Sequence, residues 1–140
     1  MDARPWARPP LTAARCAAVF IVDDDEAVRD SLELLLQSEG FETLGFASCA
    51  AALTAIDVCR PACLVLDLHL PGTGGLELLN ALVARGVRLP VVMITGRIGR
   101  ETRARALASG ADVVLGKPLD HAELVGAIRQ AGEAAAPSPA

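Results

Sequence analysis

The sequence predicts a single α/β domain with a doubly wound parallel sheet of five strands. Five short apolar runs alternate with segments of helical periodicity, a pattern typical of a parallel sheet with helices on both faces. Two of these runs stop at carboxylates, as buried strands do when they deliver charges to the edge of a sheet. The chain of 140 residues has the size of one domain, and its apolar content of 52% can supply a core.

The apolar runs are predicted to be strands because they are short and rich in Val, Ile and Leu. They are Ala17–Asp23, Glu42–Phe46, Cys63–Asp67, Val91–Thr95 and Val113–Leu115. Apolar residues at helical spacing predict five helices between and after the strands. Their approximate limits are Val28–Gly40, Ser48–Asp57, Leu76–Gly86, Glu101–Ser109 and His121–Ala131. Ser48 is an expected N-cap, Asp120 with Glu123 resembles a capping box, and glycines end several of the helices.

The termini and the overall charge set limits on location and partners. Residues 1–15 are rich in Pro and Ala and predict a flexible extension, residues 16–132 the domain, and residues 133–140 a flexible tail. The N-terminal segment has no apolar stretch of the signal-peptide kind, and no apolar run approaches the ~20 residues needed to cross a bilayer. A cytoplasmic protein is therefore expected. The net charge of −4 argues against a nucleic-acid-binding surface.

The cysteines give no sign of a metal site. Cys16, Cys49, Cys59 and Cys63 lack the paired spacing of a zinc site, and the two histidines do not complete one. We expect these cysteines to be buried free thiols in a reducing compartment.

Three carboxylates end two of the predicted strands. Asp23 and Asp24 follow the first strand, and Asp67 ends the third. If these strands are neighbours, the three charges meet at one edge of the sheet, where an unpaired cluster is costly. A hard divalent cation with oxygen ligands would offset that cost, and Mg²⁺ is the usual occupant of an open site that keeps its waters.

The ends of the fourth and fifth strands add a hydroxyl and an ammonium group. Thr95 ends the fourth strand, and Lys117 follows the fifth. A carboxylate can attack phosphorus and form an acyl phosphate, while a metal, a lysine and a hydroxyl contact the phosphoryl oxygens. Lys117 precedes Pro118, and a cis peptide there would aim the lysine back over the strand ends. The combination indicates phosphoryl transfer.

Six segments carry a resemblance to a known family. They are Ile-Val-Asp-Asp-Asp-Glu-Ala-Val-Arg (21–29), Leu-Val-Leu-Asp-Leu (64–68), Leu-Pro-Gly-Thr-Gly-Gly-Leu-Glu-Leu (70–78), Ile-Thr-Gly (94–96), Ser-Gly-Ala-Asp (109–112) and Lys-Pro-Leu (117–119). From about residue 17 to 131 the chain resembles a response-regulator receiver domain of bacterial two-component signalling, which implies a flavodoxin-like (βα)5 fold. The sequence is similar to receivers of LuxR-type regulators, although no DNA-binding domain follows here.

The resemblance implies a role for each matching residue. Asp67 is the implied phosphoacceptor, with Thr95 as the switch hydroxyl and Lys117 as the phosphoryl contact. Asp23 and Asp24 are the implied Mg²⁺ ligands, together with Asp67 and the backbone carbonyl of His69. The implied donor is a sensor histidine kinase or a phosphotransfer protein. Such a domain catalyses its own phosphorylation and slow dephosphorylation and has no separate substrate, so we do not expect an enzyme.

The sequence departs from the family pattern in the fifth strand. The position that usually carries a switching aromatic ring is Val114, whose short, stiff side chain cannot fill and vacate a pocket as a ring does. His69 and Arg97 flank the expected acceptor pocket, where they either control the hydrolytic water or face solvent. The basic stretch of Arg97, Arg100, Arg103 and Arg105 is either a solvated face or a partner or dimer contact across the fourth helix and fifth strand.

Several other interpretations remain open at this point. Asp25 is expected to be a helix N-cap rather than a metal ligand, and Gly72, Gly74 and Gly75 a turn that opens the third helix. One rival function is a haloacid-dehalogenase-like phosphohydrolase, but such enzymes place the nucleophile in a DxD motif on the first strand. Another is a binding module that keeps the fold and is not phosphorylated, which the change at Val114 allows.

Overall fold

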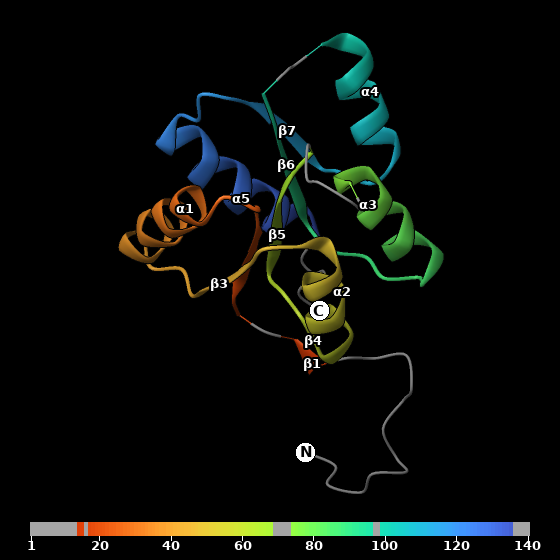
Figure 1. The fold of residues 1–140 in the computed structure, drawn as a ribbon, viewed down its shortest axis with the longest axis horizontal. Helices are drawn as coiled ribbons and strands as arrows, with labels where there is room; N and C mark the ends of the chain where they lie inside the picture. The colour runs from red at the N-terminus through yellow and green to blue at the C-terminus, as the bar shows by residue number, and fades with distance from the viewer. Residues whose placement is uncertain (1–13, 16, 69–73, 97–98, 136–140) are drawn as a thin grey trace, which may run out of the picture.

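The computed structural model describes residues 14–15, 17–68, 74–96 and 99–135 (Figure 1). The main sheet contains β2 (Val19–Val22), β3 (Thr43–Phe46), β5 (Cys63–Asp67), β6 (Val91–Thr95) and β7 (Val113–Gly116). The helices are α1 (Glu26–Ser38), α2 (Cys49–Val58), α3 (Gly75–Ala84), α4 (Arg100–Ala108) and α5 (His121–Ala135). All five predicted strands and all five predicted helices are therefore present, and the predicted fold class is confirmed.

The strand order defines where a ligand site can lie. The five strands are parallel and lie in the order β3-β2-β5-β6-β7. The direction of winding reverses between β2 and β5, and ligands of open α/β sheets bind beyond the carboxyl ends of the strands at such a point. We call this side of the sheet the carboxyl edge and the opposite side the amino edge. Asp23 directly follows β2 and Asp67 ends β5, so both acids lie at the reversal point.

Two apolar layers cover the two faces of the sheet. Figure 1 shows α1 and α5 on one side and α2, α3 and α4 on the other. On the first side, Leu36 and Leu124 pack with Ile21 and Val65, and on the second, Ile56 and Leu78 belong to the core that includes other strand residues. The helix α4 is weakly anchored by comparison, because Ala106 is its one buried residue.

The local signals for helix ends are confirmed. Asp25 is the N-cap of α1 and accepts hydrogen bonds from the backbone N–H groups of Ala27 and Val28. Ser48 caps α2 through Ala51 N–H, and Asp120 accepts from Glu123 N–H at the start of α5. These short side chains satisfy N–H groups that have no partner within the helix.

A second, two-stranded sheet was not expected from the sequence. β1 (Ala14–Arg15) pairs in parallel with β4 (Cys59–Arg60). Residues 14 and 15, which the sequence analysis assigned to a flexible extension, are thus paired with β4, and residues 1–13 lie outside the described residues. Two paired residues need no apolar alternation, so the sequence pattern carried no signal for them.

The prediction of free thiols is partly wrong. Cys49 and Cys63 are buried and free, whereas Cys59 is disulfide-bonded. Burial, helped by the charge of Asp112, raises the pKa of the Cys63 thiol to about 12. That thiol stays protonated at neutral pH and acts as an apolar core residue.

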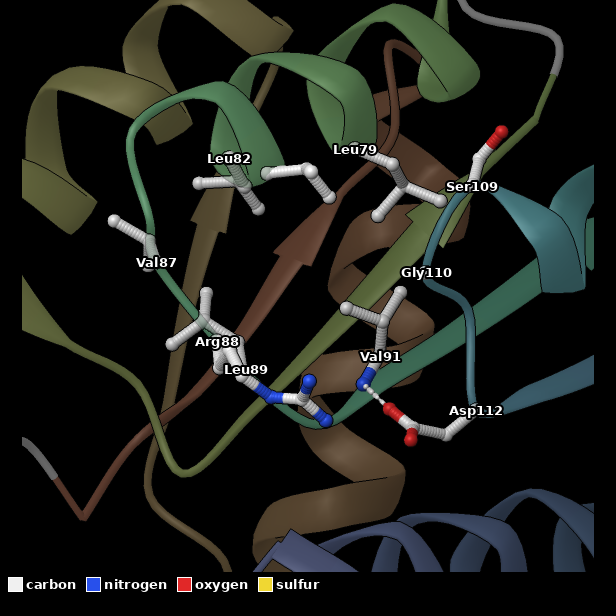
Figure 2. Close-up of a pocket in the computed structure, with 10 residues that line it drawn as sticks. Leu79, Leu82, Val87, Arg88, Leu89, Val91, Ser109, Gly110 and Asp112 are labelled. Atoms are coloured by element: carbon white, nitrogen blue, oxygen red, sulfur yellow. Dashed lines mark hydrogen bonds between the residues drawn. The ribbon is translucent and has the colours of Figure 1, made fainter.

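A small cavity of about 120 Å³ lies beside Val91, the first residue of β6, and therefore at the amino edge, opposite the acids. Figure 2 shows the residues that line it. Leu79 and Leu82 of α3 and Val91 of β6 supply apolar walls. Beside it, the carboxylate of Asp112 accepts a hydrogen bond of 2.7 Å from the backbone N–H of Val91. This contact joins the first residue of β6 to the turn before β7, so Asp112 has a structural role.

Candidate functional site

The two strand-end acids are brought together by the register of the sheet. Val22 pairs with Leu66, so Asp23 and Asp67 each come one residue further along neighbouring strands. Both acids are buried, whereas Asp24 is exposed at the rim. The structure therefore places all three predicted carboxylates at the carboxyl edge, with Asp23 and Asp67 buried and Asp24 on the surface.

The close approach of these acids affects the pKa of Asp23. Burial is the main cause that raises the pKa of its carboxyl group, and the negative charges of Asp67 and Asp24 raise it further. A hydrogen bond of 2.9 Å from the backbone N–H of Asp25 to Asp23 Oδ1 acts in the opposite direction, as does the charge of Lys117. A nearby cation would relieve the remaining repulsion.

The side chain of Lys117, which follows β7, reaches across β6 to Asp67 at the end of β5. Its Nζ lies 2.9 Å from Oδ2 of Asp67, although the two residues are fifty positions apart. The Lys117–Pro118 peptide bond is cis, as the sequence suggested it could be, and the backbone N–H of Lys117 donates to the Thr95 carbonyl. The hydrogen bond to Asp67 is the main cause that raises the pKa of Lys117, so the lysine keeps its charge.

Thr95 lies between these two partners. It is the last residue of β6, the strand between β5 and β7, and its exposed fraction is 0%. Its register partner is Gly116, directly before Lys117. Thr95, the residue predicted to supply a hydroxyl group, thus lies at the same edge as the acids and the lysine.

The remaining predicted positions divide into two groups. Val114 is buried on the face of the sheet that α4 covers, opposite Met93 in the register, and belongs to the same apolar cluster as Ala106. Its role as the replaced switch aromatic stays a prediction. His69 and Arg97, predicted for the metal carbonyl and for control of hydrolysis, lie outside the described residues.

The donor set at the carboxyl edge fits Mg²⁺. Within the described ranges, no three His, Cys, Asp or Glu side chains form a ready-made metal cluster. Mg²⁺ does not require one, because it keeps several waters and uses one or two carboxylates together with phosphate oxygens. Asp23 and Asp67 supply two buried carboxylates, and Asp24 adds a third negative charge that acts on both Asp23 and Lys117.

Gly75 supports the site in a way that the sequence pattern did not reveal. A Cβ atom at this first residue of α3 would lie 2.8 Å from the backbone oxygen of Asp67 and 3.1 Å from Cα of Leu68. Only glycine allows this close approach of a helix start to the end of β5. Sequence reasoning placed Gly75 in a turn but could not foresee the contact, which depends on how α3 packs.

Arg29 was also missed. Its Nη1 donates a hydrogen bond of 2.8 Å to the backbone carbonyl of Asp23, six residues earlier in the chain. The residue is in the helix that follows the acids, so reasoning from strand ends alone does not select it.

Strand order and the position of the acids define a flavodoxin-like α/β domain, and comparison with known proteins narrows the class. Residues 19–129 match the family model of the response regulator receiver domain. The chain is 40% identical over 111 residues to the transcriptional regulatory protein FixJ of Azorhizobium caulinodans, covering 79% of this chain and 53% of FixJ. It is 36% identical over 121 residues to nodulation protein W of Bradyrhizobium diazoefficiens, covering 86% and 53%.

A solved structure agrees with these sequence matches. The crystal structure of FixJ-N has a TM-score of 0.79 to this chain at 34% identity, covering 88% of this chain and 98% of that one. The chain therefore belongs to the response regulator receiver domain family, a family of signalling domains rather than classical enzymes. It spans about half the length of the curated relatives it matches. Among the described residues, no helix is long and apolar enough to cross a membrane.

Proposed function

We propose that Asp67 accepts a phosphoryl group from a sensor histidine kinase or phosphotransfer protein, with Mg²⁺ held by Asp23, Asp24, Asp67 and the His69 carbonyl. The observation that carries the proposal is the buried Asp67 carboxylate, hydrogen-bonded to Lys117 beside Asp23 at the point where the winding of the sheet reverses. An exchange with a sensor kinase also accounts for the expected cytoplasmic location.

Each residue of the site has a separate role in the proposed phosphoryl transfer. An Asp67 oxygen forms a bond to phosphorus while the bond from phosphorus to the donor imidazole breaks. The imidazole leaves with the electron pair of that bond and is neutral, because its other ring nitrogen already carries a proton. Lys117, whose pKa is raised, holds a positive charge against the phosphoryl oxygens, and the Thr95 hydroxyl meets them from the next strand. Mg²⁺, when bound, neutralises negative charge on the acids and the phosphoryl group. The product is an acyl phosphate on Asp67.

The lifetime and the output of this state are further parts of the proposal. The domain catalyses its own phosphorylation and a slow hydrolysis, with His69 and Arg97 placed by the sequence to affect the attacking water. Phosphorylation then controls a protein partner, or a second copy of the chain, through the region of α4 and β7. The exposed side chains of Arg100, Arg103 and Arg105 give α4 a basic surface suited to such a contact. No direct nucleic-acid contact by this domain is proposed.

The rival functions make different predictions. Family membership argues against the phosphohydrolase hypothesis, because the matched family is one of signalling domains. A module that binds partners without phosphorylation is the second candidate, favoured by Val114 in place of a ring.

Incubation with acetyl phosphate and Mg²⁺, followed by intact-protein mass spectrometry, distinguishes a phosphoacceptor domain from a binding module that is not phosphorylated. One phosphoryl adduct that is absent in Asp67→Asn and in EDTA supports the proposed function. An unmodified wild-type chain under conditions that phosphorylate a control receiver would favour the binding module.

A further inference from the structure

The loop that carries the acids is held by several hydrogen bonds. The backbone N–H of Asp23 donates to the carbonyl of Phe46 in β3 at 3.1 Å, and its carboxylate accepts from Asp25 N–H at 2.9 Å. Its own carbonyl accepts from Arg29 Nη1 at 2.8 Å. Asp23 is thus tied to the neighbouring edge strand, to its own loop and to α1, and Arg29 makes the tie to α1.

The position of Arg29 depends on a glycine in β3. A Cβ atom on Gly45 would lie 3.1 Å from both Cγ and Cδ of Arg29, and 3.2 Å from Oε1 of Glu33. The backbone of Gly45 does not adopt the left-handed conformation, so the strand itself does not require glycine there. What the missing side chain provides is space for the Arg29 stem, which crosses the edge strand on its way to the acid loop.

We propose that Arg29, seated against Gly45, is a positioning residue that holds the Asp23 loop in the geometry that binds the divalent cation. This inference rests on the proposed function, because it concerns the same metal site. Hydrogen bonds to groups around a metal commonly set how tightly that metal is held. The charge of Arg29 by itself repels a cation, so an effect through geometry and an effect through charge have opposite signs.

Isothermal titration of the unphosphorylated full chain with Mg²⁺ tests the inference. Arg29→Met is expected to weaken Mg²⁺ binding by about 10-fold, as loss of a supporting hydrogen bond does. Arg29→Lys keeps the charge and a single donor and should fall between Arg29→Met and the wild type. Gly45→Val leaves every charge in place, favours the strand, and should still weaken binding by displacing the Arg29 stem.

Two controls separate position from charge and from folding. Arg88→Met removes the same charge at the amino edge (Figure 2) and should change Mg²⁺ affinity by less than about 2-fold, since distant charges are screened. In the double variant Arg29→Met, Gly45→Val, the second change should add nothing to the first, because both act on one contact. Thermal unfolding in EDTA identifies any variant that does not fold. If Arg29→Met does not fold, Arg29→Lys and Gly45→Val still test the inference.

The outcomes distinguish this inference from the proposal beneath it. Mg²⁺ binding that is weakened by Asp24→Asn, yet unchanged or tighter in Arg29→Met and unchanged in Gly45→Val, would overturn the positioning role and leave the metal site standing. A wild-type chain that binds no Mg²⁺ would overturn the proposed metal site and the positioning role together. Weakening in both variants, without additivity, supports the inference.

Discussion

Both edges of the sheet carry acidic residues, but the surroundings of these residues differ between the two edges. At the amino edge, Asp112 is exposed and accepts a hydrogen bond from the backbone of Val91, which joins two strands. At the carboxyl edge, Asp23 and Asp67 are buried next to each other, and the charge of Lys117 only partly offsets the effects that raise the pKa of Asp23. The carboxylate of Asp112 is thus stabilised by one local hydrogen bond, whereas Asp23 keeps a raised pKa, which is typical of functional sites.

The largest expected effect comes from removing the ammonium group of Lys117 at the carboxyl edge. Lys117→Met should slow phosphorylation by acetyl phosphate about 100-fold or more, because it deletes a preorganised positive charge at the reacting oxygens. Lys117→Arg should lie between Lys117→Met and the wild type. Intact mass over time measures the rate. If Lys117→Met were phosphorylated at the wild-type rate, the proposed role of the carboxyl edge in phosphoryl transfer would be contradicted.

The packing of α3 against the carboxyl edge gives the next largest effect. Gly75→Ala should lower the free energy of unfolding by about 1–3 kcal/mol, because its Cβ would collide with backbone atoms of Asp67 and Leu68. Gly126→Ala, in an exposed turn of α5 with no atom within 4 Å of the new Cβ, should instead stabilise the chain by about 0.5–1 kcal/mol. Urea denaturation compares the two, and equal effects would contradict the proposed close approach.

The structural acid offers a complementary test at the amino edge. Asp112→Ala should cost about 1 kcal/mol of stability through the lost bond to Val91 N–H. It should leave Mg²⁺ affinity and the phosphorylation rate unchanged, because it lies at the opposite edge from the acids. A clear loss of Mg²⁺ binding in this variant would show that the two edges are not independent.

The smallest expected effect is a pH dependence that is present only without metal. The pKa of the Asp23 carboxyl group is raised in the folded state, so in EDTA its ionisation should lower the stability of the wild type relative to Asp23→Asn. This loss should develop as pH rises from 3.8, the ordinary pKa of the group, through the raised value. Asp23→Asn removes this loss and should be more stable than the wild type at pH 7, with the difference shrinking toward pH 4. Added Mg²⁺ should stabilise the wild type more than Asp23→Asn. Thermal melts across pH measure both effects, and a stability difference between the wild type and Asp23→Asn that does not change over this range would contradict the prediction.

The sequence was sufficient for the parts of the site that follow from strand ends. Each apolar run delivers its last residue to one edge, so Asp23, Asp67 and Thr95 could be placed together before any coordinates. The helix caps at Asp25 and Ser48 were equally predictable, because their partners lie within three residues. The roles of these site residues in phosphoryl transfer remain predictions that the experiments above test.

What the sequence could not show depends on contacts between elements. The tie from Arg29 to Asp23 and the approach of Gly75 to Asp67 exist only after α1 and α3 pack on the sheet. The pairing of β1 with β4 involves two residues on each side, too few for a periodic signal. The disulfide at Cys59 was missed because spacing along the chain says little about which thiols meet in space.

The shallow attachment of α4 has a consequence for how a signal could leave the molecule. Ala106, one small side chain, is its buried residue, so lifting this helix exposes little apolar area. Local opening of such an element costs far less than global unfolding, and its amides should exchange with solvent deuterium well before those of the central strands. A chemical change at the neighbouring strand ends therefore needs to supply only a modest free energy to shift the population of α4 from its present position to other positions.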